Sequence, residues 1–217
     1  SDEASNWGRV NGAAAYALKA RALLYRASKL NNPDGNTAYW ANAAQAAADF
    51  ITQNNKQSYP YRLYNTGNPE NDYYECFTTN PVYNNEIILA RSVWNTNQVE
   101  KVFLPVGFTG SFSGNGRTNP TQNLVDAYEM SNGKRIDENG STYDAANPYK
   151  DRDPRLAQTI FYQGMMWGRA DKEERRAIDV RYNSDADKGV DYTSAMGGTY
   201  TGYYLKKFVN NISCKEP

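Results

Sequence analysis

The chain has 217 residues, and its 24 lysines and arginines balance 24 aspartates and glutamates, so the formal net charge is zero. This length is sufficient for one large domain or two small ones, each with a real core. A neutral balance argues against a nucleic-acid-binding protein, which needs a basic surplus to neutralise phosphates. The chain contains no histidine, which excludes a Ser-His-Asp triad, a Cys-His pair and any zinc site with an imidazole ligand.

Two helices are predicted at the start of the chain. Apolar residues recur at helical spacing over residues 7–30, mostly as alanines with Leu24 on the same face. Pro33 and Gly35 then interrupt the helix. A second helix is predicted from Thr37, a suitable N-cap, to about residue 53, with Trp40 and Ile51 on its inner side. We therefore expect Trp40, like Trp7 on the first helix, to lie in the core.

This pair has the size and alanine content of a tetratricopeptide-like helical hairpin, and any other antiparallel helix pair would also fit. The predicted organisation is such a hairpin over residues 1–54, followed by a loop-rich ligand-binding region over residues 55–217. Helical repeats bury a continuous core only by stacking, and about three are needed for stability. We therefore expect the hairpin to pack on the remainder of the chain or on a segment outside this sequence.

The rest of the chain is rich in asparagine, tyrosine, proline and glycine, which predicts loops with a few short elements. A helix is predicted over residues 122–130, capped by Thr121, with Leu124, Val125 and Tyr128 facing inward. Apolar runs predict strands or short buried segments. They cover residues 86–90, 156–162 and 203–209. The two long loops are predicted over residues 54–85 and 94–120, and long loops inside compact domains are usually functional or mobile.

No motif for a cofactor or a metal ion stands out, and we predict neither. The glycines between Gly110 and Gly116 lack the endings of a phosphate-binding or dinucleotide-binding loop. The acidic residues between Asp185 and Asp191 resemble only a fragment of a calcium loop, without the closing glutamate. The two cysteines, Cys76 and Cys214, are too few for a disulfide framework, and we favour two free thiols.

Six segments in order resemble one family, the SusD/RagB nutrient-binding lipoproteins of the Bacteroidetes outer membrane. The matching segments span nearly the whole chain. They are residues 9–10 with 19–25, residues 85–88, residues 120–130 with 132–133, residues 147–149 with 152–155, residues 162–164 with 167, and residues 202–208. The fourth segment joins Asn147-Pro148-Tyr149 to the Arg-Asp-Pro-Arg sequence of residues 152–155, and the last segment contains Tyr203 and Tyr204.

This resemblance implies a mostly α-helical fold in which tetratricopeptide-like hairpins support a loop-rich binding region with a few short strands. It also implies a surface-exposed outer-membrane lipoprotein that pairs with a SusC-like TonB-dependent transporter. Such a protein captures an oligosaccharide or polysaccharide, or a peptide in some members, and delivers it to the transporter without chemistry. Family members are longer, and their lipidated N-terminal cysteine is absent from this sequence, so we interpret the chain as an internal fragment.

Tyrosine and asparagine suit a sugar site, because a ring stacks on the apolar face of a sugar while an amide bonds its hydroxyl groups. The chain has 18 tyrosines, and 13% of its residues are aromatic. Loops carry function more often than regular elements do, so the candidates are loop residues. The first group is Trp94, Asn95, Phe108, Phe112, Asn115 and Arg117; the second group is Tyr73, Tyr74 and Phe77.

Three functions from different classes compete at this stage. A glycan-capture protein of an uptake system, with a peptide-binding member of the same family as its variant, is the leading hypothesis. A tetratricopeptide-like scaffold that binds only proteins is the second. A carbohydrate-active enzyme is the third, but no catalytic residue is predicted, because a serine or cysteine nucleophile would have no imidazole base. With 24 acidic residues, a candidate pair of carboxylates carries no information.

Overall fold

The computed structural model describes most of the chain as two compact units. The described residues are 8–80, 84–90, 98–108, 113–168, 175–194 and 197–209. One unit comprises Ser1–Thr66 and Thr79–Trp94, and the other comprises Gly67–Thr78 and Asn95–Pro217. The unit that contains the helical hairpin thus takes in chain beyond residue 54. No helix in the described part of the chain is both long and apolar enough to cross a membrane.

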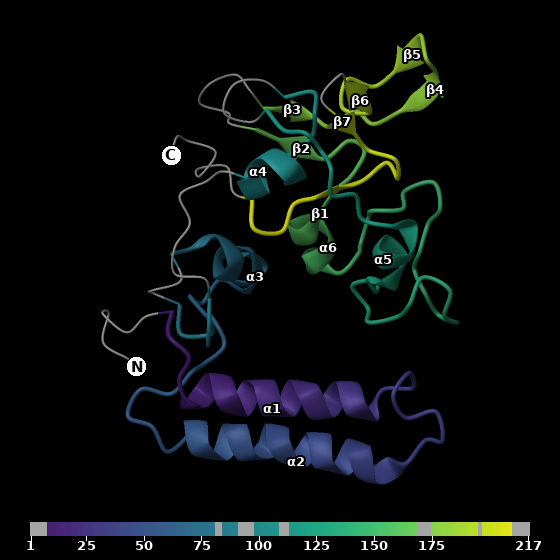
Figure 1. Ribbon diagram of the computed structural model, residues 1–217. Coiled ribbons are helices and arrows are strands. Elements are labelled where there is room, and N and C mark those ends of the chain that lie inside the picture. The colour runs from purple at the N-terminus through teal and green to yellow at the C-terminus, as the bar shows by residue number, and fades with distance from the viewer. Residues whose placement is uncertain are drawn as a thin grey trace. The chain divides into compact units, whose positions relative to one another are not determined.

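The first unit is built on two antiparallel helices, α1 (Gly12–Ala27) and α2 (Thr37–Asn54) (Figure 1). Asparagine caps both of them: the side chain of Asn11 accepts from the amide of Ala14, and that of Asn36 accepts from the amide of Ala38. These bonds satisfy backbone donors that a helix start leaves free. The predicted hairpin is therefore present, but its first helix ends at Ala27, and Asn36 rather than Thr37 is the second cap.

A buried asparagine shapes the turn between the two helices. Asn32 is 5% exposed, and its amide donates to the carbonyl oxygens of Ala27 and Asn36 at 3.4 and 3.0 Å. Its side-chain oxygen accepts from the amide of Asn36 at 2.8 Å. Gly35 adopts a φ of 69°, which glycine reaches without steric cost. This local hydrogen bonding brings α2 back along α1.

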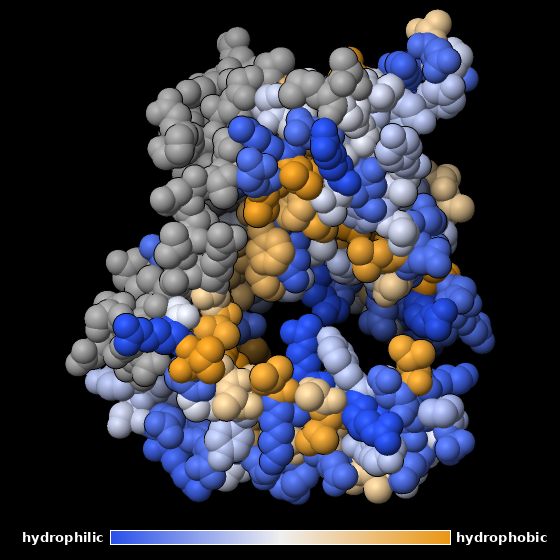
Figure 2. Space-filling model, viewed as in Figure 1, coloured by the Kyte–Doolittle hydropathy of each residue, from blue (hydrophilic) through white to orange (hydrophobic). Residues whose placement is uncertain are grey.

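Small residues form the contact between α1 and α2. The buried side chains of the pair are Ala14, Ala27, Ala43 and Ala46. The larger residues that were expected to face inward do not: Leu24, Trp40 and Ile51 are 49%, 50% and 57% exposed. Each helix of a two-helix pair has a single neighbour, so only a narrow stripe is buried. Apolar side chains accordingly lie among hydrophilic ones on the face of the hairpin that Figure 2 presents.

In its described residues, the second unit contains four short helices and a set of very short strands (Figure 1). The helices are α3 (Pro69–Thr78), α4 (Gln98–Phe103), α5 (Gln122–Ala127) and α6 (Pro154–Thr159). The strands form four antiparallel pairs in the described residues: β1 (Ile160–Phe161) with β8 (Tyr204–Leu205), β2 (Met166–Trp167) with β3 (Arg176–Ala177), β4 (Tyr182–Ser184) with β5 (Asp187–Lys188), and β6 (Thr193–Ser194) with β7 (Gly197–Gly198).

Two apolar clusters form the core of the second unit. The larger one comprises Leu104, Phe108, Phe161, Trp167, Ile178, Val180, Tyr204 and Val209. The smaller one comprises Val125, Leu156, Ile160 and Tyr203. The β1–β8 pair contributes residues to both clusters, because Phe161 and Tyr204 belong to the larger cluster and Ile160 belongs to the smaller one. Trp167, Tyr203 and Tyr204 are thus packing residues.

A buried arginine links the smaller cluster to the loops around it. Arg152 is 7% exposed, and its guanidinium donates to the carbonyl oxygens of Pro148, Val125 and Tyr128 at 2.7–2.8 Å. Two of these carbonyls lie at the C-terminal end of α5, where a cation is favourable. The neighbouring Asp153 caps α6 by accepting from the amide of Arg155.

Several local expectations were wrong. Residues 86–90 form turns and bends that are partly exposed, rather than a strand or a short buried segment. The predicted strand over residues 156–162 is instead helix α6 followed by the two-residue strand β1, because Asp153 and Pro154 provide a cap and a first helical residue. The expected loop over residues 94–120 contains α4. In contrast, residues 54–85 were expected to be loop with short elements, and α3 is such an element. The mostly α-helical class with a few short strands is confirmed.

Candidate ligand-binding surface

Phe108, one of the predicted stacking residues, belongs to the core. It is 5% exposed, and the guanidinium carbon of Arg176 lies 3.9 Å from the centre of its ring. A ring face covered by a cation of the same chain is not available to a sugar. Phe108 therefore stabilises the second unit and does not line a binding surface in this structure.

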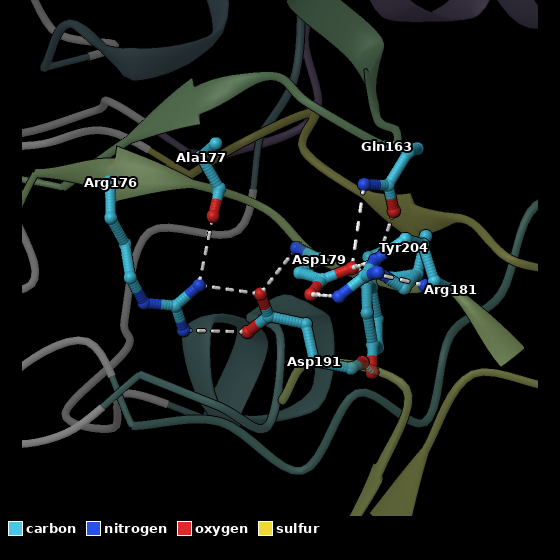
Figure 3. Close-up of polar contacts among 8 residues, drawn as sticks. Gln163, Arg176, Ala177, Asp179, Arg181, Asp191 and Tyr204 are labelled. Atoms are coloured by element: carbon cyan, nitrogen blue, oxygen red, sulfur yellow. Dashed lines mark hydrogen bonds and ion pairs between the residues drawn. The ribbon is translucent and has the colours of Figure 1, made fainter. Parts of the chain in front are cut away.

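A buried carboxylate, that of Asp191, binds the Arg176 side chain that covers Phe108. Figure 3 shows the Arg176–Asp191 pair. The two terminal nitrogens of Arg176 donate to the side-chain oxygens of Asp191 at 2.6 and 2.8 Å. Asp191 has no solvent-exposed surface, and it also accepts from the amide of Asp179 at 2.8 Å. The hydroxyl of Tyr204 donates to the Asp191 carbonyl. Asp191 is thus fully engaged in a structural network, and no cluster of metal-ligating side chains occurs among the described residues.

A second ion pair extends this network to the β4 strand. Arg181 donates to both carboxylate oxygens of Asp179 at 2.8 Å, which lowers the pKa of Asp179 to about 2. Gln163 accepts from the amide of Val180 at 2.7 Å (Figure 3). These contacts fix the backbone of residues 176–191, which leads into the surface described below.

Tyr73, Tyr74 and Phe77 lie on helix α3 and not in a loop. Tyr73 contacts Phe77 edge-to-face at 5.1 Å, and Phe77 contacts Phe208 in the same way at 5.4 Å. The ammonium group of Lys207 lies 4.0 Å from the centre of the Phe77 ring. These aromatic side chains are half-buried and pack against the segment that follows β8, so they join α3 to the rest of the second unit.

Lys206 belongs to the same cluster. Its ammonium group donates to the carbonyl of Ala157 at 2.8 Å and lies 5.6 Å from the Tyr74 ring and 5.7 Å from the Trp167 ring. Burial lowers the pKa of Lys206 to about 8, because a buried ammonium loses hydration. This lysine is part of the packing between α3 and α6.

Asn115 and Arg117 lie on a segment that packs tightly beside α4. The amide of Asn115 donates to the carbonyl of Lys101 at 2.6 Å, and that of Arg117 donates to the carbonyl of Val102 at 2.8 Å. Glycines make this approach possible: a Cβ on Gly114 would lie 2.2 Å from the Leu104 carbonyl oxygen. The Arg117 side chain is exposed, and no acidic partner for it occurs in the described part of the chain.

The same segment supports an exposed tyrosine that the sequence reasoning missed. Asn119 donates to the carbonyls of Gly116 and Tyr203 at 2.9 and 3.3 Å, and its side-chain oxygen accepts from the amide of Tyr200 at 3.3 Å. Tyr200 is 98% exposed. We call Asn115, Arg117, Asn119 and Tyr200 the Tyr200 surface. A tyrosine between threonines in a glycine-flanked turn, residues 197–202, is the signal that could have indicated it.

A pair of stacked tyrosines adjoins the Tyr200 surface. Tyr182 and Tyr192 stack with ring centres 4.8 Å apart. The amide of Thr199 donates to the Tyr192 carbonyl at 2.9 Å, which ties this pair to the turn that carries Tyr200. The remaining predicted site residues, Trp94, Asn95 and Phe112, lie outside the described residues.

The chain thus joins an α-helical hairpin to a unit of short helices and short antiparallel strand pairs, and its class is a mostly helical, loop-rich protein. The SusD family model matches residues 51–216, and the chain belongs to this family. The expected family is thus confirmed. SusD-like proteins are nutrient-binding proteins rather than enzymes.

Solved structures agree with the family and the fold. A SusD-like protein from Bacteroides fragilis is 25% identical over 95% of this chain and 38% of its own, with a TM-score of 0.60. The selenomethionine structure of a protein designated BT4246 is 18% identical over 94% of this chain and 47% of its own, with a TM-score of 0.64. This chain therefore spans less than half the length of either protein. No curated protein matches the sequence significantly.

Proposed function

We propose that this protein binds a glycan at the bacterial cell surface and delivers it to a SusC-like TonB-dependent transporter. Membership of the SusD family supports a nutrient-binding role and a partner of the SusC type in general. It also supports a location on the outer membrane, where a lipid anchor would hold the protein. In this role the chain positions its ligand and breaks no bond.

The observation that carries the glycan proposal is the exposure of Tyr200 on a turn that is hydrogen-bonded to Asn119, two residues after Arg117 in the sequence. Its ring is 98% exposed on a backbone that Asn119 holds in place. An aromatic ring offers a flat apolar face to the CH groups of a sugar. Arg117 presents a planar set of donors on the segment that carries Asn119, and Asn115 on the same segment supplies an amide. We propose that these groups bind the glycan, together with Trp94, Asn95 and Phe112 as sequence-based candidates.

Affinity electrophoresis in gels that contain a neutral polysaccharide tests the proposal. Tyr200→Ala removes a stacking face worth about 1 kcal/mol, so the dissociation constant is expected to rise roughly fivefold. Tyr25→Ala is the matched control, because Tyr25 is 54% exposed on α1 of the other unit. The control is expected to keep the retardation of the unaltered chain.

The same experiment separates the competing functions. Equal retardation of the Tyr200→Ala variant and the unaltered chain would remove the Tyr200 surface from the proposal. Binding to a peptide mixture without binding to any polysaccharide would favour the peptide-binding variant. New reducing ends after incubation with a glycan panel would contradict a purely binding role.

A further inference from the structure

The start of α1 and the end of α2 lie at the same end of the hairpin (Figure 1). Residues of the first unit line a pocket there. Its volume is about 290 Å³, near the lower end of the range for small-molecule sites. Aromatic rings and amides dominate its wall. The residues that matter most are Tyr16 from α1, Phe50 and Gln53 from α2, and Gln57 and Tyr59 from the following segment.

The wall of this pocket is held in place by hydrogen bonds. The amide of Tyr61 donates to the side-chain oxygen of Asn54 at 2.8 Å, and the Asn54 amide group donates back to the Tyr61 carbonyl at 3.0 Å. The side chain of Asn11, which caps α1, donates to the Tyr61 hydroxyl at 3.0 Å. The segment after α2 is thereby pinned to both helices, so the cavity is formed before any ligand arrives.

The chemistry of the wall defines the class of ligand. No charged residue lines the pocket in the part of the chain that the structure describes, so an ionic ligand would lose hydration without gaining a counter-charge. Tyr16, Phe50 and Tyr59 supply ring surface. No hydrogen bond to another described residue involves the hydroxyls of Tyr16 and Tyr59 or the side-chain amide of Gln53. Such a wall suits a neutral molecule with apolar faces and hydroxyl edges.

We propose that this pocket is a second saccharide-binding site, which takes one or two sugar rings of a neutral oligosaccharide. The proposal rests on the role in glycan capture proposed above, but its residues are different. All of the lining residues belong to the first unit, whereas Tyr200 belongs to the second. A chain with both sites holds one oligosaccharide class at two independent places.

Titrations followed by amide NMR shifts test this site in the 217-residue chain. The probes are maltotriose, cellotriose and xylotriose, and the background is Tyr200→Ala, which removes the stacking residue of the other surface. One of these trisaccharides is expected to shift the amides of Gly12 and Ala13, which line the pocket. Adding Tyr59→Ala is expected to weaken that binding at least fivefold.

Matched variants separate a binding role from a structural one. Tyr59 is 73% exposed and Leu63 is 81% exposed, so replacing either by alanine leaves the fold intact. Leu63→Ala is expected to leave the titration unchanged, and Tyr59→Phe to retain most of the affinity because the ring remains.

Each other outcome has a defined meaning. Trisaccharide shifts confined to the second unit would overturn the pocket site and leave the proposed function in place. Loss of all binding in Tyr200→Ala would do the same. No shift with any trisaccharide at tens of millimolar, in the unaltered chain as well as in Tyr200→Ala, would overturn both proposals. Binding only of an anionic probe, trigalacturonic acid, at Gly12 and Ala13 would overturn the neutral-ligand assignment.

Discussion

Replacing Asp191 by alanine tests the buried network that supports the second unit. The change removes an acceptor of three hydrogen bonds, two from Arg176 and one from the amide of Asp179. Removing one partner of a buried ion pair costs about 3–5 kcal/mol, because the other charge stays behind without compensation. The Arg176 side chain is 35% exposed, however, while that of Asp191 is 0% exposed.

Water can therefore solvate part of the freed guanidinium, which reduces the ion-pair contribution to about 2–3 kcal/mol. The unsatisfied amide of Asp179 adds about 1 kcal/mol. We expect Asp191→Ala to lower the free energy of unfolding by roughly 3–4 kcal/mol. Asp187→Ala is the control, because Asp187 is exposed on the neighbouring strand β5 and its loss is expected to cost no more than about 0.5 kcal/mol.

Urea unfolding followed by near-ultraviolet circular dichroism measures these free energies. A cycle with Arg176→Met and the double variant isolates the pair, and the two residues are expected to couple by at least about 1.5 kcal/mol. A cost below about 1 kcal/mol for Asp191→Ala would refute the reasoning. A coupling near zero would do so as well, since it would show that Asp191 acts without Arg176.

Two further changes test packing and titration. Gly114→Ala would place a Cβ 2.2 Å from the Leu104 carbonyl oxygen, so it is expected to lower the free energy of unfolding by about 1–3 kcal/mol. Gly12→Ala is the control, because a Cβ there would have nothing within 4 Å, and it is expected to change stability by less than about 0.5 kcal/mol. Equal urea midpoints for the two variants would contradict the close contact at Gly114. Lys206 has a folded-state pKa of about 8 against an ordinary value of 10.5, so above pH 8 the unfolded chain binds more protons and stability rises with pH. Lys206→Met is expected to remove that rise between pH 7.5 and 9.5, and an identical pH slope in both proteins would show that Lys206 does not cause it.

Local patterns in the sequence were sufficient to predict the family, the fold class and the helical hairpin. Pro33 and Gly35 mark the turn, and alanines at helical spacing mark the two helices that meet there. Thr121 was recognised as a helix cap and accepts from the amide of Leu124, as predicted. These features depend on residues close together in the chain, which is why they can be read without the fold.

The burial of each side chain depended on contacts between residues far apart in the chain. Phe108 and Tyr200 are both aromatic residues in glycine-rich segments, yet one is 5% exposed and the other 98%. Phe108 is buried because it packs in the larger apolar cluster and Arg176 from another segment covers its ring. Trp40 was expected in the core but is 50% exposed, because the described helix against which α2 packs, α1, covers only a narrow stripe of it.

The sequence by itself therefore determined the kind of protein, since the residues that specify helix ends, turns and family segments act locally. Only the tertiary structure decided which rings face solvent and which amides line a cavity. The pocket beside Tyr16 and Tyr59 illustrates this, because its wall joins the start of α1 to the end of α2. Burial is a property of the assembled neighbours of a side chain, and no local pattern encodes them.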